Sequence, residues 1–295
     1  MKTMLVLSMG ALLLAGTLSA QTPVPEWQAG VDKMKSLIQT NPAQASEEVG
    51  ELLKGKNKKN VDLVTSVAHV YLDAGKLTEA QEYLAMAKKA DNKDPKVSVL
   101  EGDIALAQKN IGQACQLYEQ AIYFDPNCKE AYLKYAQAYK SASPALAIEK
   151  LEQLKAVDPN CLEADRELAE VYYSSNRFGK AAEMYAKFID TPLATEDDML
   201  KYAFALFLNH DFEKSLQVAQ KGLQKNARHA AFNRLVMYNN TDLKRYEDAE
   251  KAAHAFFNAS DRADYSYLDY RYYGALLSAL KKYDEAIIEY GKALE

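Results

Sequence analysis

The sequence is poor in the residues that interrupt helices and in those that form disulfides. Its 295 residues include only 12 glycines, 8 prolines, 3 cysteines and 1 tryptophan. Scarce glycine and proline, with abundant alanine, leucine, lysine and glutamate, disfavour extended sheet and favour a nearly all-helical chain. Because 48% of the residues are hydrophobic, the chain has enough apolar material for a core.

An excess of positive charge and the usual catalytic motifs are also missing. The 36 lysines and arginines are outnumbered by 41 aspartates and glutamates, which is the wrong sign for a nucleic-acid-binding protein. There is no glycine-rich phosphate loop and no nucleophile elbow. The four histidines lack metal-ligand spacing; they are His69, His210, His229 and His254. We therefore expect no enzyme, no cofactor and no metal site.

Residues 1–20 have the pattern of a secretory signal peptide. Lys2 precedes an apolar run from Met4 to Leu14, and small residues follow up to Ala20. A retained anchor is the alternative, because residues 3–25 carry no charge and could span a bilayer; membrane contact is expected only in that case. No cysteine follows the run, which excludes a lipid anchor there. We expect export to a bacterial periplasm or cell envelope, with an extracellular location as the alternative.

The rest of the sequence repeats itself with a period near 34. Three columns of residues recur over seven copies, which indicates a repeat protein. The first column is Ala68, Gly102, Ala136, Ala169, Ala203, Met237 and Gly274; the second is Ala80, Ala114, Ala147, Ala181, Ser215, Ala249 and Ala286; the third is Ala87, Ala121, Leu154, Phe188, Gly222, Phe256 and Ala293. The predicted repeats start near 61, 95, 129, 162, 196, 230 and 267.

Each repeat is predicted to be a pair of helices. In the third repeat, large and small residues at i, i+3, i+4 and i+7 form one helix face, and a second face follows after a Ser-Pro turn. The first face is Tyr132, Tyr135, Ala136 and Tyr139, and the second is Ala147, Leu151 and Leu154. No pair buries its apolar face alone, so neighbouring pairs must stack to form the core.

These columns resemble the tetratricopeptide (TPR) repeat, whose pattern is a large residue, Leu-Gly, Tyr, then Ala, an aromatic residue, Ala and Pro. Besides the third repeat, the matches are Ala114, Tyr118, Ala121 and Pro126, then Leu168, Ala169, Tyr172, Phe178, Ala181 and Tyr185. The resemblance covers residues 61–295 and implies an all-α, right-handed superhelical solenoid of helix-turn-helix repeats. Glu101, Asp165 and Asn240 depart from the pattern, because they occupy columns of larger residues.

The two ends of the array differ. Residues 21–60 are predicted to form N-terminal capping helices, broken at Asn41-Pro42, and a basic linker, which we interpret as a solvated loop rather than a contact for an acidic partner. At the other end, Ala286, Tyr290 and Ala293 present an apolar face. We expect either that the chain continues there or that the face mediates self-association.

The resemblance implies that partners dock on the concave side, which the first helices line. Arginines and aromatic residues, the types enriched in binding hot spots, gather in its C-terminal half. The predicted partner-binding groove is Arg166, Tyr173, Leu200, Phe204, Phe207, Arg234, Tyr238 and Arg271. For Phe204 and Phe207, burial in the core is the competing interpretation. The Lys and Asn that clamp a terminal carboxylate in co-chaperone TPR domains are missing, because Thr65 and His69 stand there.

The sequence thus predicts a non-catalytic exported scaffold that binds a protein or peptide partner in an envelope assembly or adaptor role. One alternative is a carbohydrate- or nutrient-binding accessory subunit of an envelope uptake system, ranked lower because the only tryptophan, Trp27, precedes the array. A third interpretation is a self-associating structural array. Cys115, Cys128 and Cys161 are expected to be unpaired: Cys128 and Cys161 lie at equivalent points of adjacent repeats, about 10 Å apart, whereas a disulfide needs Cα atoms within about 7 Å.

Overall fold

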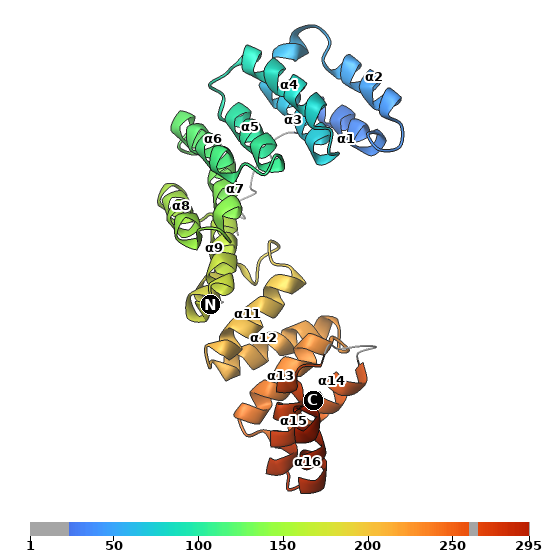
Figure 1. The fold of residues 1–295 in the computed structure, drawn as a ribbon, viewed down its shortest axis with the longest axis vertical. Coiled ribbons are helices and arrows are strands. Elements are labelled where there is room, and N and C mark those ends of the chain that lie inside the picture. The colour runs from blue at the N-terminus through green and yellow to red at the C-terminus, as the bar shows by residue number, and fades with distance from the viewer. Residues whose placement is uncertain (1–23, 260–264, 295) are drawn as a thin grey trace, which may run out of the picture.

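The computed structural model describes residues 24–259 and 265–294, and within them it contains helices and no strand (Figure 1). The predicted signal peptide lies outside the described residues. The elements are α1 (Gln28–Leu37), α2 (Pro42–Leu52), the 3-10 helix η1 (Gly55–Lys59), α3 (Val61–Asp73), α4 (Leu77–Ala90), α5 (Pro95–Ala107), α6 (Ile111–Phe124), α7 (Lys129–Tyr139), α8 (Pro144–Val157), α9 (Leu162–Ser174), α10 (Phe178–Phe188), α11 (Glu196–Leu208), α12 (Phe212–Lys225), α13 (Ala230–Asp242), α14 (Tyr246–Ala259), α15 (Tyr267–Ala279) and α16 (Tyr283–Lys292).

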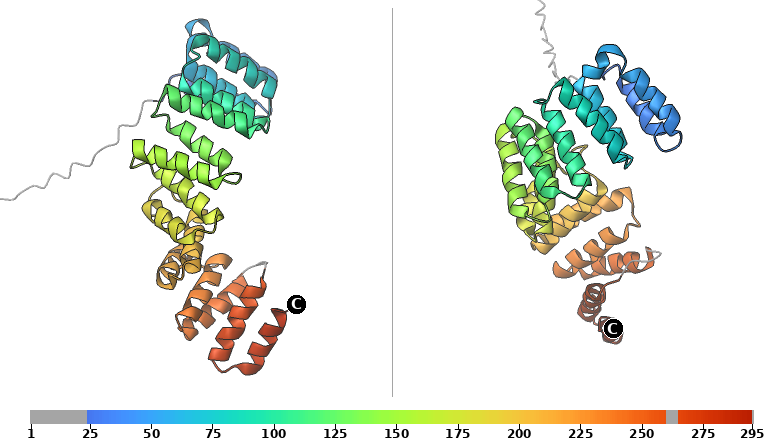
Figure 2. Two further views of the ribbon diagram at one scale, coloured as in Figure 1. Left: turned by 60° about the vertical axis from the view of Figure 1, so that its left-hand side comes forward. Right: turned by 45° about the horizontal axis from the view of Figure 1, so that its top comes forward.

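The helices form antiparallel pairs that follow one another along the length of the molecule (Figures 1 and 2). The first helices of seven pairs, α3 to α15, begin at Val61, Pro95, Lys129, Leu162, Glu196, Ala230 and Tyr267, so one period of about 34 residues is one helix pair. The pair α1–α2 and the basic segment η1 precede them. The expected fold class, an all-α right-handed superhelical solenoid, is confirmed.

Local signals explain where the helices begin and turn. Asn60, Asp94 and Asn110 are N-caps whose side chains accept a backbone N–H of the first turn, as short polar residues do at this position. The tight turn between the two helices of a pair places one residue at positive φ in six of the seven repeats. These residues are Gly75, Lys109, Asn176, His210, Lys244 and Lys281. The third repeat turns through Ser143-Pro144 instead.

Two residues that depart from the repeat pattern are neutralised by lysines. The Asp165 carboxylate is buried in α9, but Lys155 Nζ lies 2.8 Å and Lys187 Nζ 3.2 Å from its oxygens. Glu101 in α5 pairs with Lys88 at 2.5 Å. Polar residues in core columns therefore persist because the preceding and following second helices supply a cation.

Large and small residues alternate where a second helix meets the next first helix. Gly222 near the end of α12 lies against the fully buried ring of Phe232 in α13: a Cβ at 222 would come within 2.4 Å of that ring. At the equivalent positions of the preceding interface the sizes are reversed, with Phe188 in α10 and Asp198 in α11. The following interface has Phe256 and Asp269. The interfaces thus differ in which of the two helices contributes the large side chain and which contributes the small one.

Adding one methyl group at position 222 should destabilise the array. We expect Gly222→Ala to cost about 1–3 kcal/mol, because the rigid ring of Phe232 must move in a close-packed interface. The matched control is Gly50→Ala in α2, where nothing lies within 4 Å of the new Cβ and better helix propensity should add about 0.5–1 kcal/mol. Urea unfolding followed by circular dichroism measures both; equal effects would contradict the packing argument.

The three thiols form no disulfide in the structure. Cys115 and Cys161 are buried, and Cys128 is half-buried. Burial raises the pKa of Cys115 to about 11, with a further increase from Glu119, so this thiol is a poor nucleophile at neutral pH. Among residues 24–259 and 265–294, no helix is long and apolar enough to cross a bilayer.

Candidate partner-binding surface

The first helices lie on the inner side of the curved array. Neighbouring first helices contact one another directly, for example α3 with α5 and α13 with α15, whereas neighbouring second helices have little direct contact. Elements on the inside of a bend are closer together than those on the outside, so α3, α5, α7, α9, α11, α13 and α15 line the concave surface. The predicted groove residues all belong to the last four of these helices.

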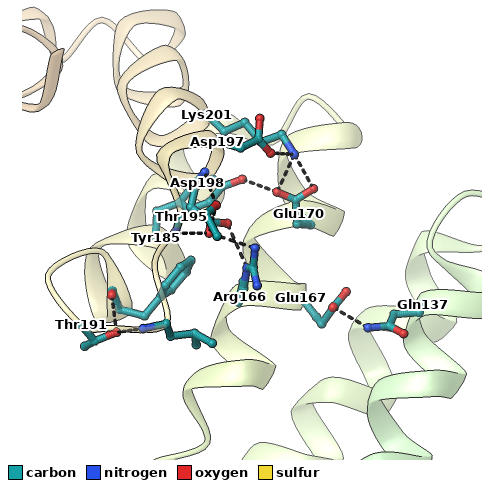
Figure 3. Close-up of polar contacts among 12 residues, drawn as sticks. Gln137, Arg166, Glu167, Glu170, Tyr185, Thr191, Thr195, Asp197, Asp198 and Lys201 are labelled. Atoms are coloured by element: carbon teal, nitrogen blue, oxygen red, sulfur yellow. Dashed lines mark hydrogen bonds and ion pairs between the residues drawn. The ribbon is translucent and has the colours of Figure 1, made fainter. Parts of the chain in front are cut away.

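Ion pairs between adjacent first helices cross the middle of this surface (Figure 3). The guanidinium of Arg166 in α9 holds the buried carboxylate of Asp198 in α11, with two N–O distances of 3.0 Å. Asp198 also accepts the backbone N–H and hydroxyl of Thr195, at 2.8 and 2.6 Å, and so closes the first turn of α11. Lys201 in α11 reaches back to Glu170 in α9 at 3.0 Å. These contacts fix the angle between two repeats.

A second buried carboxylate does the same between α13 and α15. Asp269 accepts from Arg234 Nε at 2.8 Å, from the Tyr238 hydroxyl at 2.6 Å and from the Ser266 backbone N–H at 2.7 Å. Arg166 and Arg234, both predicted as groove residues, are therefore each paired with an aspartate of the next repeat. The pairing has a simple cause: each arginine lies about one repeat before an acidic residue in the first turn of the following first helix.

The predicted aromatic residues differ in exposure. Tyr238 is 2% exposed and stacks on Tyr272 with ring centroids 4.1 Å apart, so it is a core residue and not the wall of a groove. Burial, with the neighbouring Asp269 carboxylate, raises the pKa of Tyr238. Phe207 is 8% exposed and lies 5.5 Å from Tyr238, which favours the core interpretation. Phe204 is half-buried on the same helix.

Two further predicted residues are also partly covered. Leu200 packs against the C-terminal core, and Tyr173 makes an edge-to-face contact with Phe178, with centroids 5.7 Å apart. Burial raises the pKa of Tyr173, and the charge of Lys201 opposes the increase. Neither side chain lines the pocket in which Phe207 and Arg271 meet.

A small apolar pocket opens on the concave surface where α11 and α15 approach each other. We call it the aromatic pocket; its volume is about 270 Å³, and its lining is Phe207, Leu208, His210, Phe212, Asp242, Leu268, Arg271 and Tyr272. Two predicted residues, Phe207 and Arg271, meet there. The exposed Arg271 guanidinium lies 5.8 Å from the Tyr272 ring and forms no ion pair with any residue that the structure describes.

Sequence reasoning missed most of this lining. Leu208, His210 and Phe212 lie around the turn from α11 to α12, outside the concave stripe of a first helix. Tyr272 was missed although it follows Arg271 directly; its hydroxyl donates to Asp242 at 2.8 Å. Burial, with that hydrogen bond, raises the pKa of Tyr272. Aromatic residues flanking the turn were the signal that could have indicated the pocket.

The N-terminal half of the concave surface is polar and closed by its own contacts. Asp103 in α5 accepts from His69 Nε2 at 2.9 Å, from Lys134 Nζ at 3.0 Å and from the Tyr118 hydroxyl at 2.8 Å. His69 Nδ1 lies 3.0 Å from the Thr65 carbonyl oxygen. His69, at one position of the missing carboxylate clamp, is thus part of a network joining three repeats.

Acid should weaken this network. Burial raises the pKa of Asp103, but the hydrogen bonds from His69, Lys134 and Tyr118 and the charge of Lys134 together lower it below the ordinary value. A carboxyl with a lower pKa in the folded state stabilises the fold above its unfolded pKa, and this stabilisation disappears as the pH falls through the folded pKa. We expect Asp103→Asn to reduce the loss of urea stability between pH 7 and pH 3, whereas Asp73→Asn, at an exposed position, should leave it unchanged. An equal loss in wild type and Asp103→Asn would contradict this.

Neither metal ligands nor a cover for the last helix are found in residues 24–259 and 265–294. No three His, Cys, Asp or Glu side chains there are grouped as a metal site.

In and just after α16, the predicted apolar residue Ala286 is buried, whereas Ile287 is 69% exposed and its neighbours Tyr283, Ile288 and Leu294 are also exposed. The exposed apolar residues at this end of the array therefore include the predicted Tyr290, which is 37% exposed, but not the predicted Ala286.

Stacked helix pairs, a concave surface of first helices and inter-repeat ion pairs define a helical-repeat solenoid. A family model described as tetratricopeptide repeat matches residues 67–127 and 136–193, so these two segments are similar to tetratricopeptide repeats. No curated protein sequence matches the chain.

Solved structures show the same fold. The chain is similar to the C-terminal part of a TPR repeat-containing protein from Cytophaga hutchinsonii, with 18% identity, a TM-score of 0.60, and coverage of 79% of this chain and 96% of that chain. It is also similar to PilF from Pseudomonas aeruginosa, with 16% identity, a TM-score of 0.56, and coverage of 75% and 99%. These matches indicate no enzyme family.

Proposed function

We propose that this chain is a non-catalytic scaffold of the cell envelope that binds a protein or peptide partner on its concave surface, in an assembly or adaptor role. The aromatic pocket is the observation that carries the proposal. Elsewhere on the concave surface the arginines are bound to acidic residues of the next repeat, but Arg271 is exposed beside an apolar hollow. An arginine next to buried aromatic side chains is the usual composition of an interface hot spot.

The chemistry of the pocket indicates what part of a partner it would take. Phe207, Leu268 and Tyr272 provide apolar surface, and Arg271 provides donors for a carboxylate or a main-chain carbonyl. A leucine-sized or aromatic side chain next to an acidic residue or a chain terminus would satisfy both. Asp242, already bound to Tyr272, would select against a partner with two adjacent negative charges.

A carbohydrate-binding accessory role is the second candidate. One observation favours it: the ring of Tyr267 is 60% exposed near Arg271, whose guanidinium lies 6.0 Å from the ring centroid. Exposed aromatic faces are typical of sugar sites, because the apolar body of the ring stacks on the sugar. The pocket beside it combines leucine and aromatic side chains with Arg271, a composition typical of protein interfaces, so we rank a protein partner first.

Export is part of the proposal, and its support comes from the sequence. Lys2, the apolar run from Met4 to Leu14 and the small residues before Gln21 have the composition and order of a cleaved signal peptide. A periplasmic or envelope-associated scaffold would meet its partner only after export. Export and partner binding can therefore be tested together in the cell envelope fraction.

Site-specific photo-crosslinking in the native cell tests this function. A photoreactive phenylalanine replaces Leu208 at the pocket or, as the matched control, Tyr123, which is 82% exposed on α6. We expect a protein adduct from position 208 in the envelope fraction, its loss with Arg271→Glu, and no such adduct from position 123. Identical adducts from both positions, an adduct unaffected by Arg271→Glu, or recovery only in the cytoplasm would contradict the proposal; an oligosaccharide adduct would support the second candidate.

A further inference from the structure

A second and larger cleft lies between the second helices α12 and α14, with α13 as its floor. Its volume is about 600 Å³, within the range of ligand-binding clefts. Asn233, Val236 and Asn240 form the floor. These residues belong to a different stripe of α13 from Arg234 and Tyr238, so the cleft is separate from the concave surface.

The cleft lies where this repeat has Asn233, Val236 and Asn240, which are smaller than the residues at the same positions of several other repeats. At the positions of Asn233, Val236 and Asn240, the first helix of the third repeat, α7, has Tyr132, Tyr135 and Tyr139, and α11 has Met199, Tyr202 and Leu206. The smaller side chains of α13 leave more room between α12 and α14 than the side chains of α7 or α11 would at the same positions.

The floor contains two asparagines whose side chains are largely buried but whose carboxamides keep unused hydrogen-bonding groups. Asn240 is 3% exposed, and no hydrogen bond joins its carboxamide to any described residue. Asn233 is 4% exposed; its amide nitrogen donates to the Ala227 and His229 carbonyl oxygens at 3.0 and 3.2 Å, but its oxygen accepts from none of the described residues. The fully buried side-chain atoms without a partner in the described residues are Ser175 Oγ and Asn239 Oδ1, so the free groups of Asn233 and Asn240 are not enclosed. They open into the cleft, where a ligand can pair with them.

The walls add apolar surface and charges that are already paired. Leu216 and Gln220 come from α12, and Ala252 comes from α14. Arg245 is bound to Glu213 with N–O distances of 2.7 and 3.1 Å, and Lys251 lies 3.2 Å from Asp248. Because these charged side chains are already paired within the protein, the groups of the cleft that remain available to a ligand are neutral amides.

We propose that this cleft binds an extended peptide segment through its main chain. A carboxamide offers one acceptor and one donor group, which match the N–H and C=O of a peptide unit. Asn233 and Asn240 are two helical turns apart, so their Cα atoms are separated by about 10 Å along the axis. An extended chain covers that distance in about three residues, and Gln220 in the wall provides a third carboxamide. This site is independent of the proposed concave-surface function.

Filling the cleft with the residue found in other repeats tests the proposal. Random decapeptides displayed on phage are selected on the wild-type chain, and their affinities are then measured for Asn240→Tyr, Asn240→Leu and Thr241→Tyr. Tyrosine occupies the position of Asn240 in α7 and α9, so the fold should accept it. Thr241→Tyr places the same side chain one position later, outside the cleft.

We expect both Asn240 variants to keep wild-type helicity and to lose at least about tenfold in peptide affinity, because they remove hydrogen bonds to a buried main chain. Thr241→Tyr should bind within about twofold of wild type. In the wild-type chain, the peptides should shift the side-chain amide NMR signals of Asn233 and Asn240, a result that does not depend on any variant. No enriched peptide, equal binding by all variants, or shifts caused only by a neutral oligosaccharide would overturn the proposal.

Discussion

Asp269→Ala is expected to unfold the C-terminal repeats more readily than any surface substitution. The substitution removes a fully buried carboxylate that accepts from Arg234, Tyr238 and Ser266. Removing one member of a buried, hydrogen-bonded ion pair typically costs about 3–5 kcal/mol, a large part of the stability of a whole domain. Urea unfolding by circular dichroism measures the loss, and hydrogen exchange in α13 and α15 locates it.

Two variants sharpen this result. Asp269→Asn keeps the size of the side chain and one acceptor oxygen, so its cost should be smaller than that of alanine. Asp284→Ala removes an exposed aspartate from the first turn of α16 and should cost no more than about 1 kcal/mol. If Asp269→Ala and Asp284→Ala are equally mild, the buried carboxylate does not join the two repeats as the contacts indicate.

Phe207→Ala should be the second large loss, and Phe204→Ala a smaller one. Phe207 is buried among Phe212, Tyr238 and Tyr272, with centroid distances of 5.7, 5.5 and 6.2 Å. Truncating such a ring leaves a cavity and costs about 3–5 kcal/mol. Phe204 is only half-buried, so we expect about half of that loss or less. Melting temperatures distinguish the two.

The expected loss of stability in Phe207→Ala also determines which variants are suitable for testing partner binding. Because Phe207→Ala should lower stability, lost binding in that variant would not identify a contact. Arg271→Ala and Leu208→Ala change exposed residues of the aromatic pocket and should alter stability by no more than about 0.5 kcal/mol. A melting temperature of Phe207→Ala equal to that of Leu208→Ala would show that the ring of Phe207 is not part of the core.

The fold could be predicted because it depends on local and periodic features. Small residues such as Ala136 and Ala147 recur with the length of one helix pair, and caps such as Asn110 and Asp94 stop one helix and start the next. Stacking then follows, since no pair can bury its apolar face alone.

The candidate site could be predicted only in part. Arg271, predicted as a groove residue, is exposed, whereas Arg234 is paired with Asp269, which lies 35 residues later and belongs to the next repeat. The stripe of a single helix cannot show such a pairing. Asn240 was recognised as a departure from the pattern, yet the cleft beside it depends on the side chains that α12 and α14 place around it.

The alternation of large and small residues between Gly222 and Phe232, with the reverse order at Phe188 and Asp198, makes the repeats non-interchangeable. Excision of residues 196–229 would remove α11 and α12 as one whole repeat and keep the period of the remaining helices, but it would bring Phe188 of α10 against Phe232 of α13. Two phenylalanines would then compete for one space. A repeat can be lost or gained in evolution only where the second helix and the first helix that are newly joined already fit each other. The packing at these interfaces, more than the constant repeat length, therefore limits changes in the number of repeats.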